Sequence, residues 1–379
     1  MSNTITLSNR LKSLDALRGF DMFWIVGGDS ISHGLSNATN LRFFNWLSLQ
    51  MTHSRWDGFT IYDLIFPLFM FVAGVAMPFS IGRRLEKVPE DEKYAKKKKI
   101  YLKLLKRCII LILLGLIING DLAFKAYDQT RFASVLGRIG ISCFIAALIY
   151  MNTNWKQQVI IFVSILVGYF LIITLIPVPG FGAGVLTPHG NLSGYIDRLL
   201  LPGEVLRGSY DPEGILSTIP AIGTVMLGVF AGLLLRLPDN KCNAKRKASY
   251  LLMGGIALLI VGLLGNFVMP INKNIWTSSF VIFCGGWSSL LLGIFYLIID
   301  VWKIEKWCVP FIWLGMNSIL IYLVSHGIID FGSSAKYLFG GILDKIPNIW
   351  QMTFLWIGIV ILEFWFLHFL YKRKLFWKI

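Results

Sequence analysis

A short run near residue 53 gathers side chains that can do chemistry. His53, Arg55, Trp56 and Asp57 fall within five positions, and a long apolar stretch follows with Asp63 a few residues inside it. An imidazole accepts a proton near neutral pH, which suits a general base. A neighbouring carboxylate, either Asp29 or Asp63, would fix its tautomer and stabilise the imidazolium. Trp56 offers a flat face for a ligand ring, or it belongs to an aromatic belt at a membrane surface.

Other polar residues interrupt the apolar stretches of the chain. A carboxylate within hydrocarbon costs about 2.5–3.5 kcal/mol on insertion scales, so it is kept where it has a partner or a role. Helical rise and the predicted topology place Asp29, Asp63 and Arg138 in the outer third of the membrane, Asn317 near its middle and His326 near its outer face. We expect these five residues to converge with His53 on one outward-facing cavity. Two simpler interpretations remain, namely a buried Asp63–Arg138 ion pair and an interhelical hydrogen bond from Asn317.

The elements that must position these residues are membrane helices. Of the 379 residues 55% are hydrophobic and only 15% are charged, and the apolar residues form blocks long enough to cross a bilayer. We predict an all-α polytopic membrane protein with a single domain over 1–379. The ten predicted spans are 15–36, 60–82, 101–119, 132–150, 156–176, 214–236, 248–269, 276–300, 309–328 and 348–371.

The basic residues favour one of the two sets of alternating loops. One set holds 22 lysines and arginines and the other holds nine, although the net charge of +15 alone would also suit a nucleic-acid partner. Because positive loops stay in the cytoplasm, we place both termini there, with His53 and a polar insertion at about 177–213 outside. This distribution indicates a lipid bilayer and no nucleic acid. The five scattered cysteines give no spacing typical of a metal site.

Six stretches, taken in order, resemble the membrane heparan-α-glucosaminide N-acetyltransferase family, within the transmembrane acyltransferase superfamily. They cover nearly the whole chain, and the second and fourth are the most specific. The six are "LDALRGFDMFWIVGGD" (14–29), "HSRWDGFTIYDLIFPLFMFVAG" (53–74), "RFASVLGRIGISCFIAALI" (131–149), "YIDRLLLPGE" with "YDPEGILSTIPAIGTVMLGVFAG" (195–232), "SSFVIFCGGWSSLLLGIFYLIID" (278–300) and "LGMNSILIYLVSH" (314–326).

The resemblance implies transfer of an acetyl group from cytosolic acetyl-CoA to the amine of a terminal glucosamine across the membrane. It places the catalytic role on His53, which opens the motif H-x-x-W-[ND]-G-[LF]-T. Asp29 stands where lysosomal members have an asparagine near that histidine, and we expect it to orient His53. We expect the chain to lack the large luminal N-terminal domain of the animal enzyme. We therefore expect a bacterial homologue in the cytoplasmic (inner) membrane, acting on a free amino sugar or short glycan.

The roles of the remaining residues follow from this chemistry. Trp56, Asp57, Asp63, Arg138, Asn317 and His326 are the candidate substrate contacts. Arg18 and the basic loops are the candidate sites for the CoA phosphates, and no metal is expected. His53 acts either as a base or as a nucleophile that carries the acetyl group.

Two other functions stay open from the residues alone. Intramembrane charges and glycine-interrupted helices also suit a secondary transporter of a sugar or other small solute. An O-acyltransferase acting on a glycan would share the cofactor and change only the acceptor. The sequence leaves open whether the chain forms a homodimer.

Overall fold

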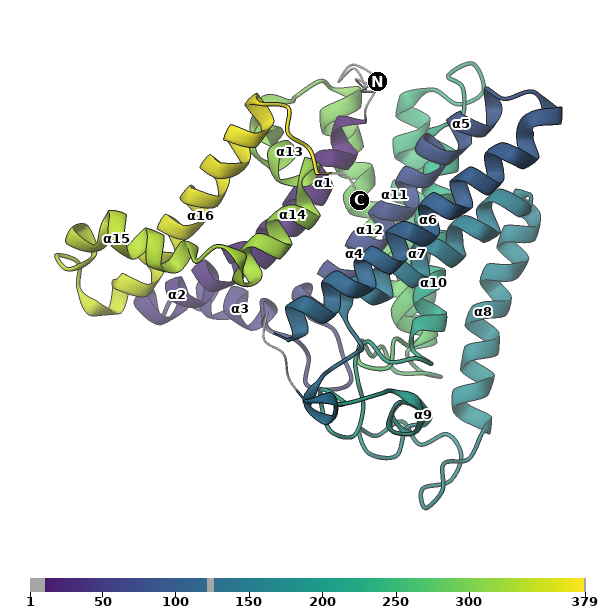
Figure 1. The fold of residues 1–379 in the computed structure, drawn as a ribbon, viewed down its shortest axis with the longest axis horizontal. Helices are drawn as coiled ribbons and strands as arrows, with labels where there is room; N and C mark the ends of the chain where they lie inside the picture. Colours follow the sequence, from purple (N-terminus) through teal and green to yellow (C-terminus); the bar gives the residue numbers. More distant parts are fainter. Residues whose placement is uncertain (1–10, 121–125, 378–379) are drawn as a thin grey trace. The chain divides into compact units, whose positions relative to one another are not determined.

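The computed structural model describes residues 11–120 and 126–377, and most of these residues fold into helices (Figure 1). Arg10, Lys125 and Lys378, which were counted among the basic loop residues, lie outside the described residues. The prediction of an all-α protein with many membrane helices is confirmed. Two isolated β-bridges supplement the helices, Arg131 with Gly203 and Val178 with Gly182.

The chain divides into two compact units, each built from several segments. Of the described residues, the first unit contains 11–51, 239–252 and 290–377, and the second contains 52–120, 126–238 and 253–289. Helices α11 (Ala244–Gly265) and α12 (Ser278–Phe295) contribute residues to both. The prediction of a single domain stays a prediction.

In the first unit, α1 packs closely against α13. A Cβ added to Gly19 would lie 1.7 Å from the carbonyl oxygen of Phe311, and one on Gly315 would lie 1.9 Å from that of Asp15. Small residues thus let two backbones meet, as is common in membrane helix pairs. The helices of this unit are α1 (Lys12–Phe23), α2 (Asp29–Thr39), α3 (Arg42–Gln50), α13 (Val309–Met316), α14 (Ser318–Leu323), α15 (Phe331–Leu343) and α16 (Asn348–Lys372).

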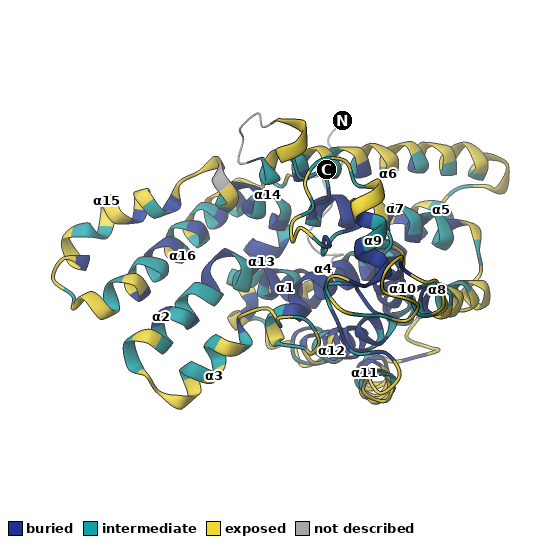
Figure 2. Ribbon diagram, turned by 90° about the horizontal axis from the view of Figure 1, so that it is seen from below, coloured by how far each residue is buried: buried dark blue, intermediate teal, exposed yellow. Residues whose placement is uncertain are grey.

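In the second unit, α4 and α10 form the buried centre and cross through glycines. A Cβ on Gly74 would lie 2.1 Å from the carbonyl oxygen of Val225, and one on Gly228 would lie 2.0 Å from that of Phe71. Figure 2 shows α10 mainly buried, whereas α8 carries exposed apolar residues such as Ile160 and Val167, as expected of a helix that faces lipid. The helices are α4 (Ile61–Met77), α5 (Arg83–Glu86), α6 (Glu90–Asn119), α7 (Val135–Asn152), α8 (Trp155–Leu175), α9 (Leu192–Leu200) and α10 (Thr218–Leu235).

Within the described residues, seven helices are long and apolar enough to cross a membrane, and a bent pair makes eight. They coincide with the second, fourth to eighth and tenth predicted spans. The bent pair, with 67° between its halves at Asn317, is the ninth. The first predicted span is divided among α1, a π-helical turn (Trp24–Gly28) and α2, while the third lies in α6, which also carries charged residues. The number of ten spans stays a prediction.

The loops of the second unit gather at the two ends of its helices. At one end Gly58 N donates to Ile271 O at 2.9 Å, and Arg131 bridges to Gly203 in the 177–213 insertion. At the other end Arg236 pairs with Glu86 at 2.6 Å. This sorting agrees with the alternation of outer and inner loops expected from the charges. The end that faces the cytoplasm, and the location of the termini, stay predictions.

Candidate active site

The best-formed polar site of the second unit centres on His53, in the loop before α4. His53 Nδ1 lies 2.8 Å from Asp63 Oδ1. The carboxylate is fully buried, whereas 47% of the imidazole side chain is exposed. A buried acid therefore holds one nitrogen of a ring that solvent can reach.

Asp63 is placed by the start of α4. Thr60 precedes the helix, and Asp63 Oδ2 accepts hydrogen bonds from the backbone N–H groups of Thr60 and Ser54, both at 3.2 Å. The spacing Thr60-x-x-Asp63 is that of a capping box, and the positive end of the helix dipole favours a carboxylate there. These donors explain how an acid is kept at the head of an apolar helix.

The contact with Asp63 fixes the tautomer of the neutral imidazole. A carboxylate accepts hydrogen bonds, so His53 Nδ1 carries the proton and donates it, which leaves the lone pair on Nε2. The ring also lies against Tyr62, with 4.7 Å between ring centroids. An oriented imidazole with a basic Nε2 can take a proton from an attacking nucleophile.

Lys273 completes this group, although the sequence analysis did not single it out as a site residue. Its Nζ lies 2.9 Å from Nδ1 and 3.1 Å from Nε2 of His53, and 3.6 Å from Asp63 Oδ1. Burial lowers the pKa of the lysine, while the charges of Asp63 and Glu213 oppose that shift. Lysine follows histidine by 220 positions, so no local spacing could reveal the contact.

The loop that carries Lys273 is fixed on both sides. Asn272 is fully buried, donates to Asp57 Oδ1 at 2.9 Å, and accepts from Ile275 N at 3.2 Å. Trp276 has a φ of 51°, which is costly for a bulky residue by about 1–3 kcal/mol, and its burial holds it there. Asp57, predicted to contact the substrate, thus also anchors this loop.

Trp56 is engaged in packing. Its Nε1 donates to Leu186 O at 2.7 Å, and its ring meets Tyr210 edge-on with 4.8 Å between centroids. It packs against a buried cluster that includes Tyr169 and Ile275. The indole therefore ties the His53 loop to the insertion, and its role as a sugar platform stays a prediction.

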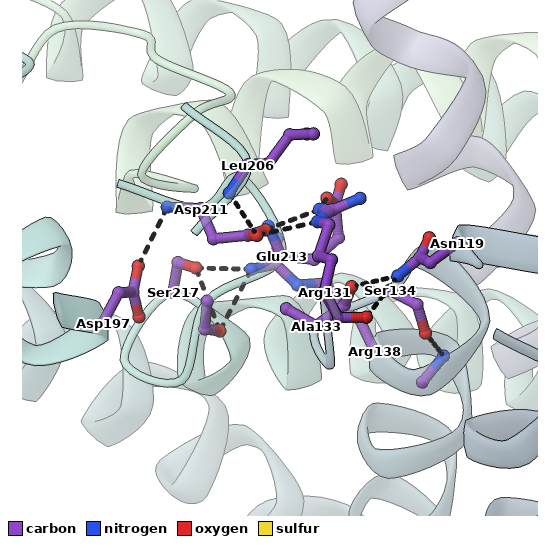
Figure 3. A network of polar contacts seen from close by, with 12 residues as sticks. Asn119, Arg131, Ala133, Ser134, Arg138, Asp197, Leu206, Asp211, Glu213 and Ser217 are labelled. Carbon is purple, nitrogen blue, oxygen red and sulfur yellow. Dashed lines mark hydrogen bonds and ion pairs between the residues drawn. The ribbon is translucent and has the colours of Figure 1, made fainter. Parts of the chain in front are cut away.

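Arg138 belongs to another polar network (Figure 3). It donates to Ser217 Oγ and to Gly214 O, and its guanidinium lies 4.9 Å from the ring centroid of Trp276. In the part of the chain that the structure describes, Asp63 pairs with His53 and Lys273. The Asp63–Arg138 ion pair considered from the sequence is therefore not what the structure shows.

The same network attaches the insertion to the start of α7. Arg131 pairs with Asp211 through two nitrogens, at 2.8 and 2.6 Å, and also with Glu213. Burial alone would raise the pKa of Asp211, but hydrogen bonds from Arg131 outweigh it and lower the pKa. Burial raises the pKa of nearby Asp197 to about 6, against the bonds it accepts from Ile215 N and Asp211 N. The cluster ties the insertion to the start of α7 (Figure 3).

The other predicted site residues lie in the first unit. Asp29 accepts from Ser30 N at 2.6 Å, and Arg18 lies 3.7 Å from Asp15. Asn317 is 2% exposed, and its amide bonds the backbone of Leu375 and Trp377 at 3.1 and 3.0 Å. Their roles toward His53, the substrate or CoA stay predictions.

His326 lines a cavity of about 530 Å³ in the first unit, together with Trp356 and Glu363. Its Nδ1 lies 2.8 Å from the carbonyl oxygen of Tyr322, and this contact leaves the Nε2 lone pair of the neutral ring available. Glu363 is buried and accepts from Ser325 at 2.7 Å. The cavity offers polar groups within an apolar lining, and the substrate role of His326 stays a prediction.

Comparison with known proteins gives one consistent result. A family model described as heparan-alpha-glucosaminide N-acetyltransferase, catalytic, matches residues 10–264. Proteins named heparan-alpha-glucosaminide N-acetyltransferase from Mus musculus and Homo sapiens are each 29% identical over 98% of this chain. The chain spans 61% and 60% of the length of these two relatives.

Proposed function

Because this chain belongs to the heparan-alpha-glucosaminide N-acetyltransferase family, we propose that it transfers an acetyl group from acetyl-CoA to the amine of an amino sugar. The observation that carries the proposal is the 2.8 Å contact between His53 and buried Asp63, at the head of a predicted membrane span. That contact gives the family's motif histidine the orientation that a base requires.

The proposed reaction needs a proton acceptor beside the amine. Acetyl-CoA supplies an activated carbonyl. As the sugar nitrogen forms its bond to that carbonyl carbon, His53 Nε2 takes a proton from the nitrogen. The carbon–sulfur bond then breaks, and His53 returns the proton to the departing thiolate. Asp63 holds Nδ1–H throughout and offsets the positive charge of the transient imidazolium.

We propose direct transfer, in which His53 moves only protons. Proton transfer needs one basic ring nitrogen, and the contact of Nδ1 with Asp63 leaves Nε2 for that role. The test is a pulse of acetyl-labelled acetyl-CoA with no sugar present, followed by rapid quenching. Direct transfer leaves the protein unlabelled, whereas an acetylated His53 would show the two-step route.

The sidedness of the reaction is also part of the proposal. The bias in basic loop residues supports acetyl-CoA entering from the cytoplasm and the sugar binding outside, in a bacterial cytoplasmic membrane. Arg18 and the basic loops are the proposed contacts for the CoA phosphates. Sealed right-side-out vesicles given external acetyl-CoA and external glucosamine should form no product, and rapid turnover there would contradict a transmembrane route.

The central test is His53→Ala in purified protein, with labelled acetyl-CoA and a panel of amino sugars. Loss of a positioned acid–base group costs about 10²–10⁴-fold in rate, so kcat should fall by that amount. Arg55→Ala is the matched control, because Arg55 is an exposed neighbour in the same loop. Acetylation by His53→Ala at the wild-type rate would refute the proposal.

A further inference from the structure

The contact between Lys273 and His53 has a geometry that an ordinary hydrogen bond does not explain. Nζ is nearly equidistant from the two ring nitrogens, at 2.9 and 3.1 Å. Nδ1 carries the proton that His53 donates to Asp63, so the ammonium cannot donate to that nitrogen. An in-plane position about 3 Å from both ring nitrogens would collide with Cε1, so Nζ lies against the face of the ring.

We propose that Lys273 is a positioning residue that keeps His53 in its neutral, base-competent form. This inference rests on the proposed function, since only a base needs to be unprotonated. Lys273 lies beyond residues 10–264, which the family model matches.

The physical reason is the balance of charge around the ring. Asp63 favours the imidazolium through Nδ1, whereas an ammonium at about 3 Å disfavours a second positive charge. The side chain of Lys273 is only 12% exposed, so water screens this repulsion weakly. Asp63 therefore orients the ring, while the positive charge of Lys273 offsets the tendency of that carboxylate to favour the imidazolium.

The other groups that face the pair do not remove this effect. Glu213 and Cys284 act on Lys273 at longer range, and Tyr62 faces the ring of His53. The ion pair with Asp63, at 3.6 Å, supports the protonated form of the lysine despite burial. The anchored loop described above then holds the ammonium in place.

Two uncharged and one charged replacement test the inference. Lys273→Met removes the charge with a similar volume, Lys273→Gln serves where that variant does not fold, and Lys273→Arg keeps the charge. Lys345→Met, at an exposed lysine of the other unit, controls for loss of one positive charge. The readouts are the pH–rate profile of acetyl transfer to glucosamine, and the pH dependence of His53 modification by diethyl pyrocarbonate, which reacts with neutral imidazole.

Lys273→Met removes a positive charge that disfavours a second positive charge on the ring. The acid limb of both profiles should therefore move to higher pH by about one unit or more in Lys273→Met, while activity returns as pH rises. Lys273→Arg and Lys345→Met should follow the wild type. A modification profile of Lys273→Met that superimposes on the wild type overturns the role of Lys273. Absence of acetyl transfer by the wild type overturns the proposed function instead, because modification of His53 needs no turnover.

Discussion

Asp63 performs two tasks with one carboxylate. Oδ2 accepts from the backbone that leads into α4, and Oδ1 holds His53. The position of the acid is thus set by helix capping, and the histidine is added to a carboxylate that the fold already needs. A residue in such a place can be tested by separating the two tasks.

Asp63→Asn should separate them. An amide oxygen can still accept from the backbone, but it no longer offsets a positive imidazole, so kcat should fall by about 10²–10⁴-fold. Thr60→Ala is the complementary variant. It should lower the free energy of unfolding by about 0.5–2 kcal/mol through the lost cap while kcat stays near the wild-type value. Equal losses of kcat in both variants would show that Asp63 acts only through the fold.

The contacts of the site differ in how far the sequence reveals them. His53 and Asp63 are ten positions apart, and the Thr60-x-x-Asp63 pattern before an apolar run is a local signal. Lys273 and the Leu186 carbonyl that holds Trp56 are brought in by tertiary packing, at separations of 220 and 130 residues. Spacing alone therefore offers Asp63 as one of two candidate partners of His53, beside Asp29, and it misses Lys273 and Leu186.

Among the helices, the positions of the spans were predicted better than the bend within one of them. Most predicted spans match observed helices, because hydropathy over a window reports burial in a bilayer directly. The bend at Asn317 escaped prediction, since it depends on the contact of that amide with the backbone of Leu375 and Trp377.

Gly74→Ala should destabilise the α4–α10 crossing. The added methyl would lie 2.1 Å from Val225 O, so a backbone must shift at a cost of about 1–3 kcal/mol. The midpoint of thermal unfolding in detergent, followed with a thiol-reactive dye, would measure this, since all five cysteines are buried in the fold. Gly254→Ala, where no atom lies within 4 Å of the new methyl, should melt at or above the wild-type temperature. A lower midpoint in both variants would point to a general intolerance of alanine.

Arg131→Gln should loosen the insertion. The variant removes the pairs with Asp211 and Glu213, and proteinase K should then cleave residues 203–209 faster in membranes with the outer face exposed. Because the pKa of Asp211 is lowered in the fold, its stabilising contribution is present above its ordinary pKa and is lost as pH falls through the lowered value. Arg207→Gln, at an exposed residue in the same loop, should be cleaved at the wild-type rate. Unchanged cleavage of Arg131→Gln would mean that other contacts hold the insertion.

For the whole molecule, the charge bias predicts which end of the second unit faces out. Arg55→Cys and Ala183→Cys are both at exposed positions and should react with a membrane-impermeant maleimide in intact cells. Lys97→Cys, in a predicted cytoplasmic loop, should react only after the membrane is opened. The wild type is the blank, because its cysteines are buried. Reaction in the reverse pattern would invert the topology and the proposed route of the acetyl group.

The contacts of His53 with Asp63 and Lys273 also determine the order in which the site forms during synthesis of the chain. His53 and Asp63 are synthesised within ten residues of each other, whereas Lys273 emerges 220 residues later. A nascent chain that ends before Lys273 already contains Asp63 and His53 but lacks the cation that lies against the ring. Contacts over such separations form late, so the histidine gains its final environment only after α11 has been inserted.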